Sequence, residues 1–236
     1  MATKNTFPGF SKTGIRFLRD LKENNDREWF TPRKPTFDAE VKGPMIELVR
    51  AVHNEMMRFA PQYVGDPTKC LFRIYRDTRF SKDKTPYKTH IAAWMKHGSA
   101  GKEAGAGFYF SVSPKTIEVA AGVHAPDPAT LLKLRQKVAE DHEAFRETFT
   151  STKFKKMIDS LMTESLSRAP KGFDPGHPAI DLIKLKHFVA YAELDPALAT
   201  SPKLLPEIVK RLEVMTPFVE YLNSALRPPG AKRPMR

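Results

Sequence analysis

The residue types best suited to chemistry gather in one short stretch of the chain, residues 73–88. Three arginines occur within seven residues, and three lysines follow within the next nine. A guanidinium group can grip a phosphate or carboxylate through two parallel hydrogen bonds, and a lysine adds a mobile positive charge. We therefore expect this stretch to bind an anionic or phosphorylated ligand. The expected ligand-binding residues are Arg73, Arg76, Arg79, Lys82, Lys84, Tyr87 and Lys88.

The distribution of charge along the chain supports an anion-binding surface. The net charge is +12, and residues 69–102 alone carry nine basic and two acidic side chains. Residues 227–236 add four basic side chains and no acidic one, so the remainder of the chain is nearly neutral. A focused excess of positive charge creates a local field that attracts anions, whereas a diffuse excess mainly affects solubility.

Several functional classes remain open for this stretch. Tyr75, Phe80 and Tyr87 alternate with the cations, which is typical of proteins that bind single-stranded nucleic acid, although the chain holds no recognised nucleic-acid motif. The chain could instead be an enzyme that acts on a small anionic or phosphorylated substrate, with Asp77 or Tyr87 transferring protons. It could also be an interaction module for an acidic protein partner. The arginines could equally form a structural ion-pair network within the fold.

The other reactive residue types favour structural roles. Cys70 is the only cysteine, which excludes an internal disulfide and a multi-cysteine metal site, and we expect it to be a small buried thiol in a strand. The seven histidines show no paired spacing typical of metal ligands, so we expect no metal and no cofactor. Trp29 and Phe30 follow a short predicted helix and are interpreted as core residues. Asn24 and Asn25 are interpreted as the end of that helix.

Two motifs carry a family resemblance. The string RDTRFSKDKTPYK at residues 76–88, and Phe17-Leu18 followed by NNDREWF at residues 24–30, resemble the hallmarks of an uncharacterised family, domain of unknown function 2461. Residues 107–109, 121–122 and 170–172 resemble later landmarks of the same family, and the resemblance covers about residues 10–226. It implies a shared fold and the importance of the two motifs, and it names no activity.

The hydrophobic periodicity changes twice along the chain. Helical spacing predicts a helix that is capped by Ser11 and ends at Asn24, a further turn at residues 26–30 that Pro32 stops, and a helix at residues 44–59. Short β-branched and aromatic runs predict strands at residues 69–76, 91–96, 108–113 and 116–121, with a hairpin at Pro114, and a further strand at 187–194. Helical spacing returns at residues 127–149, 151–161 and 202–226, with a kink or break at Pro217.

These elements predict a single α+β domain at residues 10–226, in which a central, mainly antiparallel sheet of about four strands is flanked by helices. Residues 1–9 are expected to form a loose N-terminal arm, and residues 227–236 a disordered basic tail. No apolar run approaches the roughly 20 residues that span a membrane, and we see no secretory signal. With a single cysteine, we expect a cytoplasmic protein with no membrane partner. The oligomeric state stays open.

Overall fold

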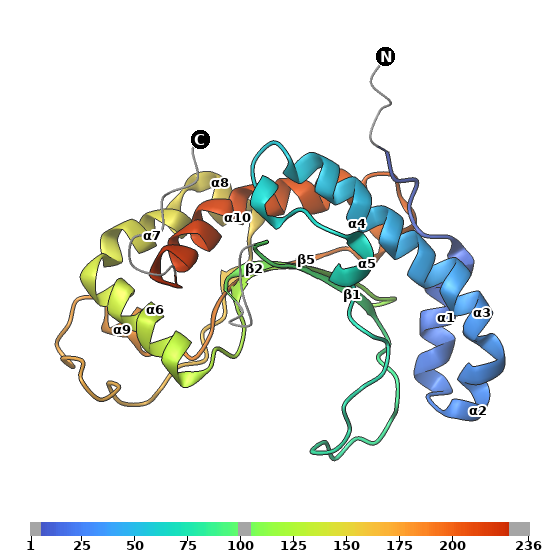
Figure 1. The fold of residues 1–236 in the computed structure, drawn as a ribbon, viewed down its shortest axis with the longest axis horizontal. Coiled ribbons are helices and arrows are strands. Elements are labelled where there is room, and N and C mark those ends of the chain that lie inside the picture. The colour runs from blue at the N-terminus through green and yellow to red at the C-terminus, as the bar shows by residue number, and fades with distance from the viewer. Residues whose placement is uncertain (1–5, 99–104, 227–236) are drawn as a thin grey trace.

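The computed structural model describes residues 6–98 and 105–226, and a five-stranded antiparallel sheet lies at its centre (Figure 1). The strand order is β1-β2-β3-β5-β4. The strands are β1 (Ile91–Met95), β2 (Gly107–Val112), β3 (Ile117–Val123), β4 (Ser160–Leu161) and β5 (Phe188–Leu194). Helices flank this sheet, which confirms the predicted α+β class.

Alternating side chains give the sheet two different faces. On β2, Phe108, Phe110 and Val112 are fully buried, whereas Tyr109 between them is half-buried. The turn into β3 is held by the Ser113 hydroxyl, which accepts a hydrogen bond from the backbone N–H of Thr116 at 3.0 Å. The hairpin predicted at this point of the chain is therefore confirmed.

The N-terminal part forms a nearly continuous helical path. It consists of α1 (Lys12–Glu23), α2 (Arg27–Phe30), a 3-10 turn (Thr31–Arg33), α3 (Lys34–Phe37), a π-helical turn (Asp38–Lys42) and α4 (Gly43–Met56). Ser11 caps α1 as predicted, because its side chain accepts a hydrogen bond from the N–H of Gly14. Pro32 was predicted to stop the helical path, but it lies in the first turn of the 3-10 segment, where no helical N–H is needed.

The strand predicted at residues 69–76 is wrong. A 3-10 turn (Pro61–Tyr63) is followed by the short helix α5 (Pro67–Cys70). Asp66 accepts a hydrogen bond from the backbone N–H of Thr68 at 2.9 Å and Pro67 occupies the first turn, and together they start a helical turn in place of a strand. Beyond α5, only isolated bridges pair Leu71 with Ala93 and Tyr75 with Tyr87.

The C-terminal part holds a second group of helices, of which α10 packs directly against the sheet. They are α6 (Pro128–Glu140), α7 (His142–Thr150), α8 (Thr152–Met157), α9 (Ile180–Ile183) and α10 (Leu204–Leu226), with a 3-10 segment (Pro196–Thr200) before α10. The helix predicted at residues 127–149 is divided at Asp141, whose carbonyl oxygen accepts a hydrogen bond from the Tyr221 hydroxyl at 2.8 Å.

Two further predictions in this part need correction. The helix predicted at residues 151–161 ends at Met157, because Ile158 is extended and Ser160–Leu161 pairs with β5 as the edge strand β4. The five strands of the described sheet thus include β4, which was not predicted, and lack the strand predicted at residues 69–76. At Pro217, where a kink or a break was predicted, the helix does not break, because α10 stays helical from Leu204 to Leu226.

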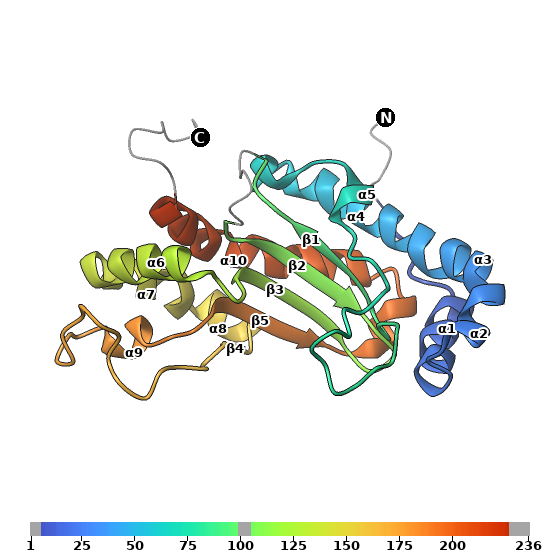
Figure 2. The same ribbon diagram turned by 60° about the horizontal axis from the view of Figure 1, so that its bottom comes forward.

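The helices α4 and α10 lie on one side of the sheet. α10 packs against β3 and β2, and α4 packs against both α10 and β1 (Figure 1). In the described part of the chain, no helix crosses the middle of the opposite face, which Figure 2 brings forward. None of the described helices is long and apolar enough to cross a membrane.

The predicted N-terminal arm is anchored at its end. Phe7 is only 4% exposed, and its ring lies edge-on to Phe10 with the ring centroids 5.6 Å apart. The arm is therefore not loose from Phe7 onward, because its aromatic ring belongs to the core. The basic tail predicted at residues 227–236 lies outside the described residues.

Gly122 on β3 provides a test of the β3–β5 contact. Its φ is +130°, and a Cβ atom there would lie 1.9 Å from the carbonyl oxygen of Phe188. Gly122→Ala should therefore lower the free energy of unfolding by about 2 kcal/mol or more in urea denaturation. Gly65→Ala is the control, because a Cβ there meets no atom within 4 Å. Equal stability of the two variants would contradict this description of the sheet.

Candidate functional site

The stretch of residues 73–88, hereafter the basic loop, leaves the sheet beside β1 and projects away from it, in teal in Figure 1. Its two arms are joined at the base. The N–H of Lys88 donates to the carbonyl of Ile74 at 2.8 Å, and the N–H of Arg76 donates to the carbonyl of Pro86 at 2.8 Å. The two arms of the loop are therefore hydrogen-bonded to each other at the base, and the tip projects beyond these bonds.

Several of the predicted ligand-binding cations are engaged within the loop itself. Arg79 donates from Nε and Nη2 to the two carboxylate oxygens of Asp77, at 3.0 and 2.7 Å. Arg76 bonds the carboxylate of Asp83 and the hydroxyl of Thr85, and so joins the two arms. Lys84 and the carbonyl of Thr78 are joined by a further hydrogen bond of 2.9 Å.

The carboxylates of these pairs are held in their charged form. The backbone N–H of Thr85 and then the Arg76 guanidinium lower the pKa of Asp83 to about 2. Hydrogen bonds from Arg79 lower the pKa of Asp77. Asp77, the sequence-predicted proton-transfer residue, is thus paired with a cation on an exposed part of the loop. These contacts are what the structural ion-pair interpretation expects of Arg76 and Arg79.

Three of the predicted cations differ from Arg76 and Arg79 because they have no carboxylate partner among the described residues. They are Arg73, Lys82 and Lys88. Lys88 is half-buried, and its Nζ lies 4.9 Å from the centroid of the Phe72 ring. Burial, and then the nearby charge of Arg73, lower the pKa of Lys88. Lys88 therefore lies over an aromatic ring at the base of the loop, and Arg73 is near enough for its charge to lower the pKa of both Lys88 and Asp77.

Tyr87 anchors the loop to the N-terminal motif. Its ring is 4% exposed and stacks on Phe30 with the centroids 4.2 Å apart. The side chain of Asn25 accepts from the N–H of Tyr87 at 3.0 Å and donates to its carbonyl at 2.9 Å. Asn24 caps α1 as predicted, but the role of Asn25 as a clamp between distant segments was missed by sequence reasoning. The ring of Tyr87 thus lies in the core.

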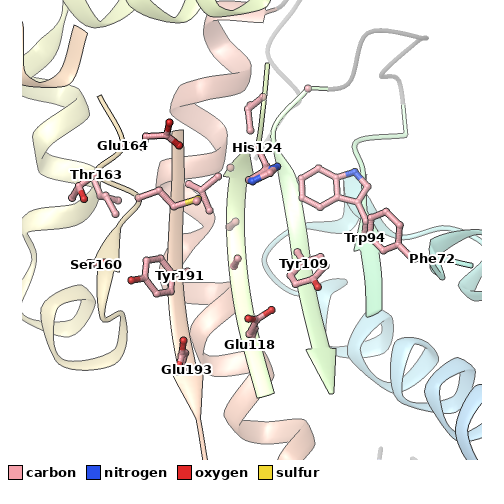
Figure 3. A pocket seen from close by; sticks show the side chains of 18 residues that line it. Phe72, Trp94, Tyr109, Glu118, His124, Ser160, Thr163, Glu164, Tyr191 and Glu193 are labelled. Atoms are coloured by element: carbon pink, nitrogen blue, oxygen red, sulfur yellow. The ribbon is translucent and has the colours of Figure 1, made fainter. Parts of the chain in front are cut away.

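Sequence reasoning also missed a cavity of about 930 Å³ on the face of the sheet opposite the helices. We call it the open-face cavity. Four aromatic side chains lie in its lining, Phe72, Trp94, Tyr109 and Tyr191 (Figure 3). The arginines of the basic loop do not line it, but Phe72, the ring beneath Lys88, does. Lys88 therefore adjoins the cavity through the Phe72 ring.

Strand register explains how residues far apart in the sequence reach this cavity. Trp94 on β1 pairs with Tyr109 on β2, Tyr109 with Ala120 on β3, and Ala120 with Tyr191 on β5. These residues form a row across the open face. The alternation of Tyr109 with buried phenylalanines was visible in the sequence. The register that brings four strands together was not.

A second row carries the polar groups. Ser111, Glu118 and Glu193 are register partners across β2, β3 and β5. The Ser111 hydroxyl donates to the Glu118 carboxylate at 3.0 Å. Burial, and then the charge of Lys88, lower the pKa of His90, while Glu118 opposes them. The cavity thus offers carboxylate acceptors in addition to aromatic walls, and His90 lies outside the residues that line it.

Cys70 lies at the end of α5 and not in a strand. It is half-buried, with its Sγ 3.9 Å from Nε2 of His53. Burial, followed by the charge of Asp66, raises the pKa of the thiol, which disfavours the reactive thiolate. Among the described residues, no group of three histidine, cysteine, aspartate or glutamate side chains could hold a metal ion.

Comparison with known proteins identifies the family to which the chain belongs. A model of the family described as "Conserved hypothetical protein (DUF2461)" matches residues 13–221 of the 236-residue chain. The resemblance read from residues 17–30 and 76–88 is therefore confirmed. Searches among curated proteins and among solved structures found no significant match.

The different roles of Arg76 and Arg79 can be tested by limited proteolysis. Phe80, at the loop tip, is 94% exposed and is a chymotrypsin cleavage site. Arg76→Ala should speed cleavage after Phe80 by on the order of fivefold, because the bonds that join the two arms are lost. Arg79→Ala should change the rate by less than about twofold, because its exposed pair is local. Equal rates for the two variants would contradict the cross-arm role of Arg76.

Proposed function

Because the chain belongs to the DUF2461 family, whose description names no activity, we propose a function from the geometry: it binds a small phosphorylated ligand in the open-face cavity. Arg73 and Lys88 would hold the phosphate. The observation that carries the proposal is the position of Lys88, which makes no ion pair among the described residues and lies over Phe72, a ring in the wall of the cavity; the charge of Arg73 is near enough to lower the pKa of Lys88.

The state of Lys88 supports a bound anion. A half-buried ammonium group without an acidic partner is unfavourable, because burial removes water that would solvate the charge. Burial and the repulsion of Arg73 both lower the pKa of Lys88. A phosphate between the two side chains would offset both effects, and charge-assisted hydrogen bonds to phosphate are among the stronger ones in proteins.

The remaining loop residues receive supporting roles in this proposal. Arg76, Arg79 and Lys84 keep the loop in shape through their internal bonds, and Tyr87 ties its base to the core. Lys82 is exposed and adds to the field that draws an anion toward the loop. The original set of ligand-binding residues is thus narrowed to Arg73 and Lys88 for direct contact.

The carboxylates of the open face favour a small ligand over a long nucleic acid. Glu118 and Glu193 line the cavity and would repel a chain of phosphates, whereas the third carboxylate of the lining, Glu164, is paired with Lys186. The volume of about 930 Å³ falls within the range that suits small-molecule ligands, roughly 300–1,000 Å³. We further propose a cytoplasmic location, as the single cysteine suggests.

An enzyme that acts on the same ligand is a second candidate. It is favoured by Glu118, whose carboxylate lines the cavity, accepts a hydrogen bond from Ser111 and could take up a proton next to a bound phosphate ester. Asp77 and Tyr87, the candidates from the sequence, lie outside the lining of the cavity. Release of inorganic phosphate from a bound ester would distinguish the enzyme from a binding protein.

Calorimetric titration with inorganic pyrophosphate tests the proposed phosphate site. Arg73→Ala/Lys88→Ala should weaken binding by about tenfold or more, because two charge-assisted contacts are lost. Affinity for the unaltered protein should fall steeply as salt rises from about 50 to about 200 mM.

The matched control is Arg50→Ala/Arg58→Ala, which removes the same charge from exposed side chains that pair with Glu47 and Glu55. It should change the affinity by less than about twofold. Arg73→Lys/Lys88→Arg should retain most of the binding. Equal losses in the two alanine pairs, or no pyrophosphate binding by the unaltered protein, would refute the site.

A further inference from the structure

The tip of the basic loop presents an aromatic ring to solvent. Phe80 is 94% exposed, and the guanidinium group of Arg79 lies 5.6 Å from the centroid of its ring. Lys82, two residues later, is exposed and makes no ion pair among the described residues. Aromatic and arginine side chains are the types enriched where proteins contact one another. The tip therefore has the composition of a protein contact.

The basic loop holds its shape before any partner binds. Arg76 joins the two arms through Asp83 and Thr85, and the Nζ of Lys84 donates to the carbonyl of Thr78 at 2.9 Å. An element that is ordered in advance loses little conformational freedom on binding. The loop holds six basic and two acidic residues, a net charge of +4. Its tip is therefore a preformed, positively charged contact element.

The open-face cavity has the complementary chemistry. Its described lining combines aromatic and aliphatic side chains with three carboxylates and holds no lysine or arginine. Two of these carboxylates, Glu118 and Glu193, are register partners and pair with no cation among the described residues. Ionised carboxylates directly opposite each other repel, and a cation beside them would relieve this repulsion. The cavity therefore suits an apolar group that arrives together with positive charge.

The basic loop does not enter the cavity of its own chain. Phe80 stays exposed, and no residue of the loop is among the described residues that line the cavity. Figure 1 shows that the loop projects on the side of the sheet opposite α4 and α10, which is the side of the cavity. Phe80 lies six residues beyond Ile74, where the arms pair, so the tip can reach up to about 20 Å from the base.

Two copies whose open faces meet would each present a loop to the other's cavity. A two-fold axis satisfies both contacts at once, because the same pair of surfaces then meets twice. Such an arrangement also closes at two copies, whereas a loop that enters a neighbour without reciprocation would build an open chain. It covers aromatic side chains that the helices leave uncovered on this face, among them Trp94 and Tyr109.

We infer that the protein forms a two-fold dimer through its open faces. Phe80 of each copy enters the open-face cavity of the other, and Lys82 of each copy meets the carboxylates of Glu118 and Glu193 there. This inference goes beyond the proposed function and does not depend on it. The phosphate contacts assigned to Arg73 and Lys88 lie at the base of the loop, so loss of the phosphate site would leave the dimer in place.

Analytical ultracentrifugation over a range of protein concentrations tests the dimer. Phe80→Ser should raise the dissociation constant by about tenfold or more, because the buried aromatic anchor is lost. The matched control is Leu132→Ser, which alters an exposed apolar residue on α6, outside both the loop and the cavity. Its dissociation constant should stay within about twofold of the unaltered value. The dimer should also weaken as salt rises.

An exchange of charges locates the contact. Lys82→Glu and Glu193→Lys alter exposed side chains, so both variants should fold. Each should weaken the dimer by on the order of tenfold, because like charges then meet across the interface. An equimolar mixture of the two variants should regain nearly the affinity of the unaltered protein, since each glutamate again faces a lysine of the other copy.

Each contrary outcome overturns the inference. A protein that stays monomeric at about 1 mM, where even weak association is detected, has no such dimer. A dimer that Phe80→Ser and both charge variants leave unchanged uses another surface. A mixture that remains dissociated shows that Lys82 and Glu193 do not meet. A dimer that is insensitive to the loop variants but is lost on removal of residues 227–236 would give the cavity to the basic tail.

Discussion

The alternation of side chains on β3 is the constraint on which the other features of this molecule depend. Ile117, Val119 and Ala121 are buried on the side where α10 packs, and Glu118 and Ala120 therefore point to the opposite side. A shift of register by one residue would exchange the two sets and bury a carboxylate in the core. Because the helices gather on one face, the same strand builds the hydrophobic core on that face and the floor of the open-face cavity on the other.

The basic loop is held in position by Asn25, which lies 62 residues before Tyr87 in the sequence. Its side chain forms hydrogen bonds with both the N–H and the carbonyl of Tyr87. The stack of Tyr87 on Phe30 completes this anchor. The two motifs that resemble a family are thereby joined in space. With the base of the loop fixed in this way, Lys88 lies over Phe72 at the wall of the cavity. In our proposal, the cations thus divide into those that shape the loop and those that can meet a ligand.

The elements with strong local patterns could be predicted from the sequence, and those set by distant partners could not. The alternation around Tyr109 predicted β2, and the capping side chain of Ser11 predicted the start of α1. Residues 69–76 have β propensity, but the cap at Asp66 starts a helical turn at this point of the chain instead. Strand β4 forms because it pairs with β5, a distant segment of the sequence. The concentration of positive charge identified the basic loop in the sequence. Whether an arginine in that loop pairs with a carboxylate depends on the fold. The cavity depends on strand register, which no local pattern contains.

A crystal structure of the protein bound to inorganic pyrophosphate tests the central claim most directly. The account predicts that the pyrophosphate lies beside Phe72, within hydrogen-bonding distance of Arg73 and Lys88. A pyrophosphate held at the tip of the basic loop by Arg79 and Lys82, or on the helical side of the sheet, would contradict it.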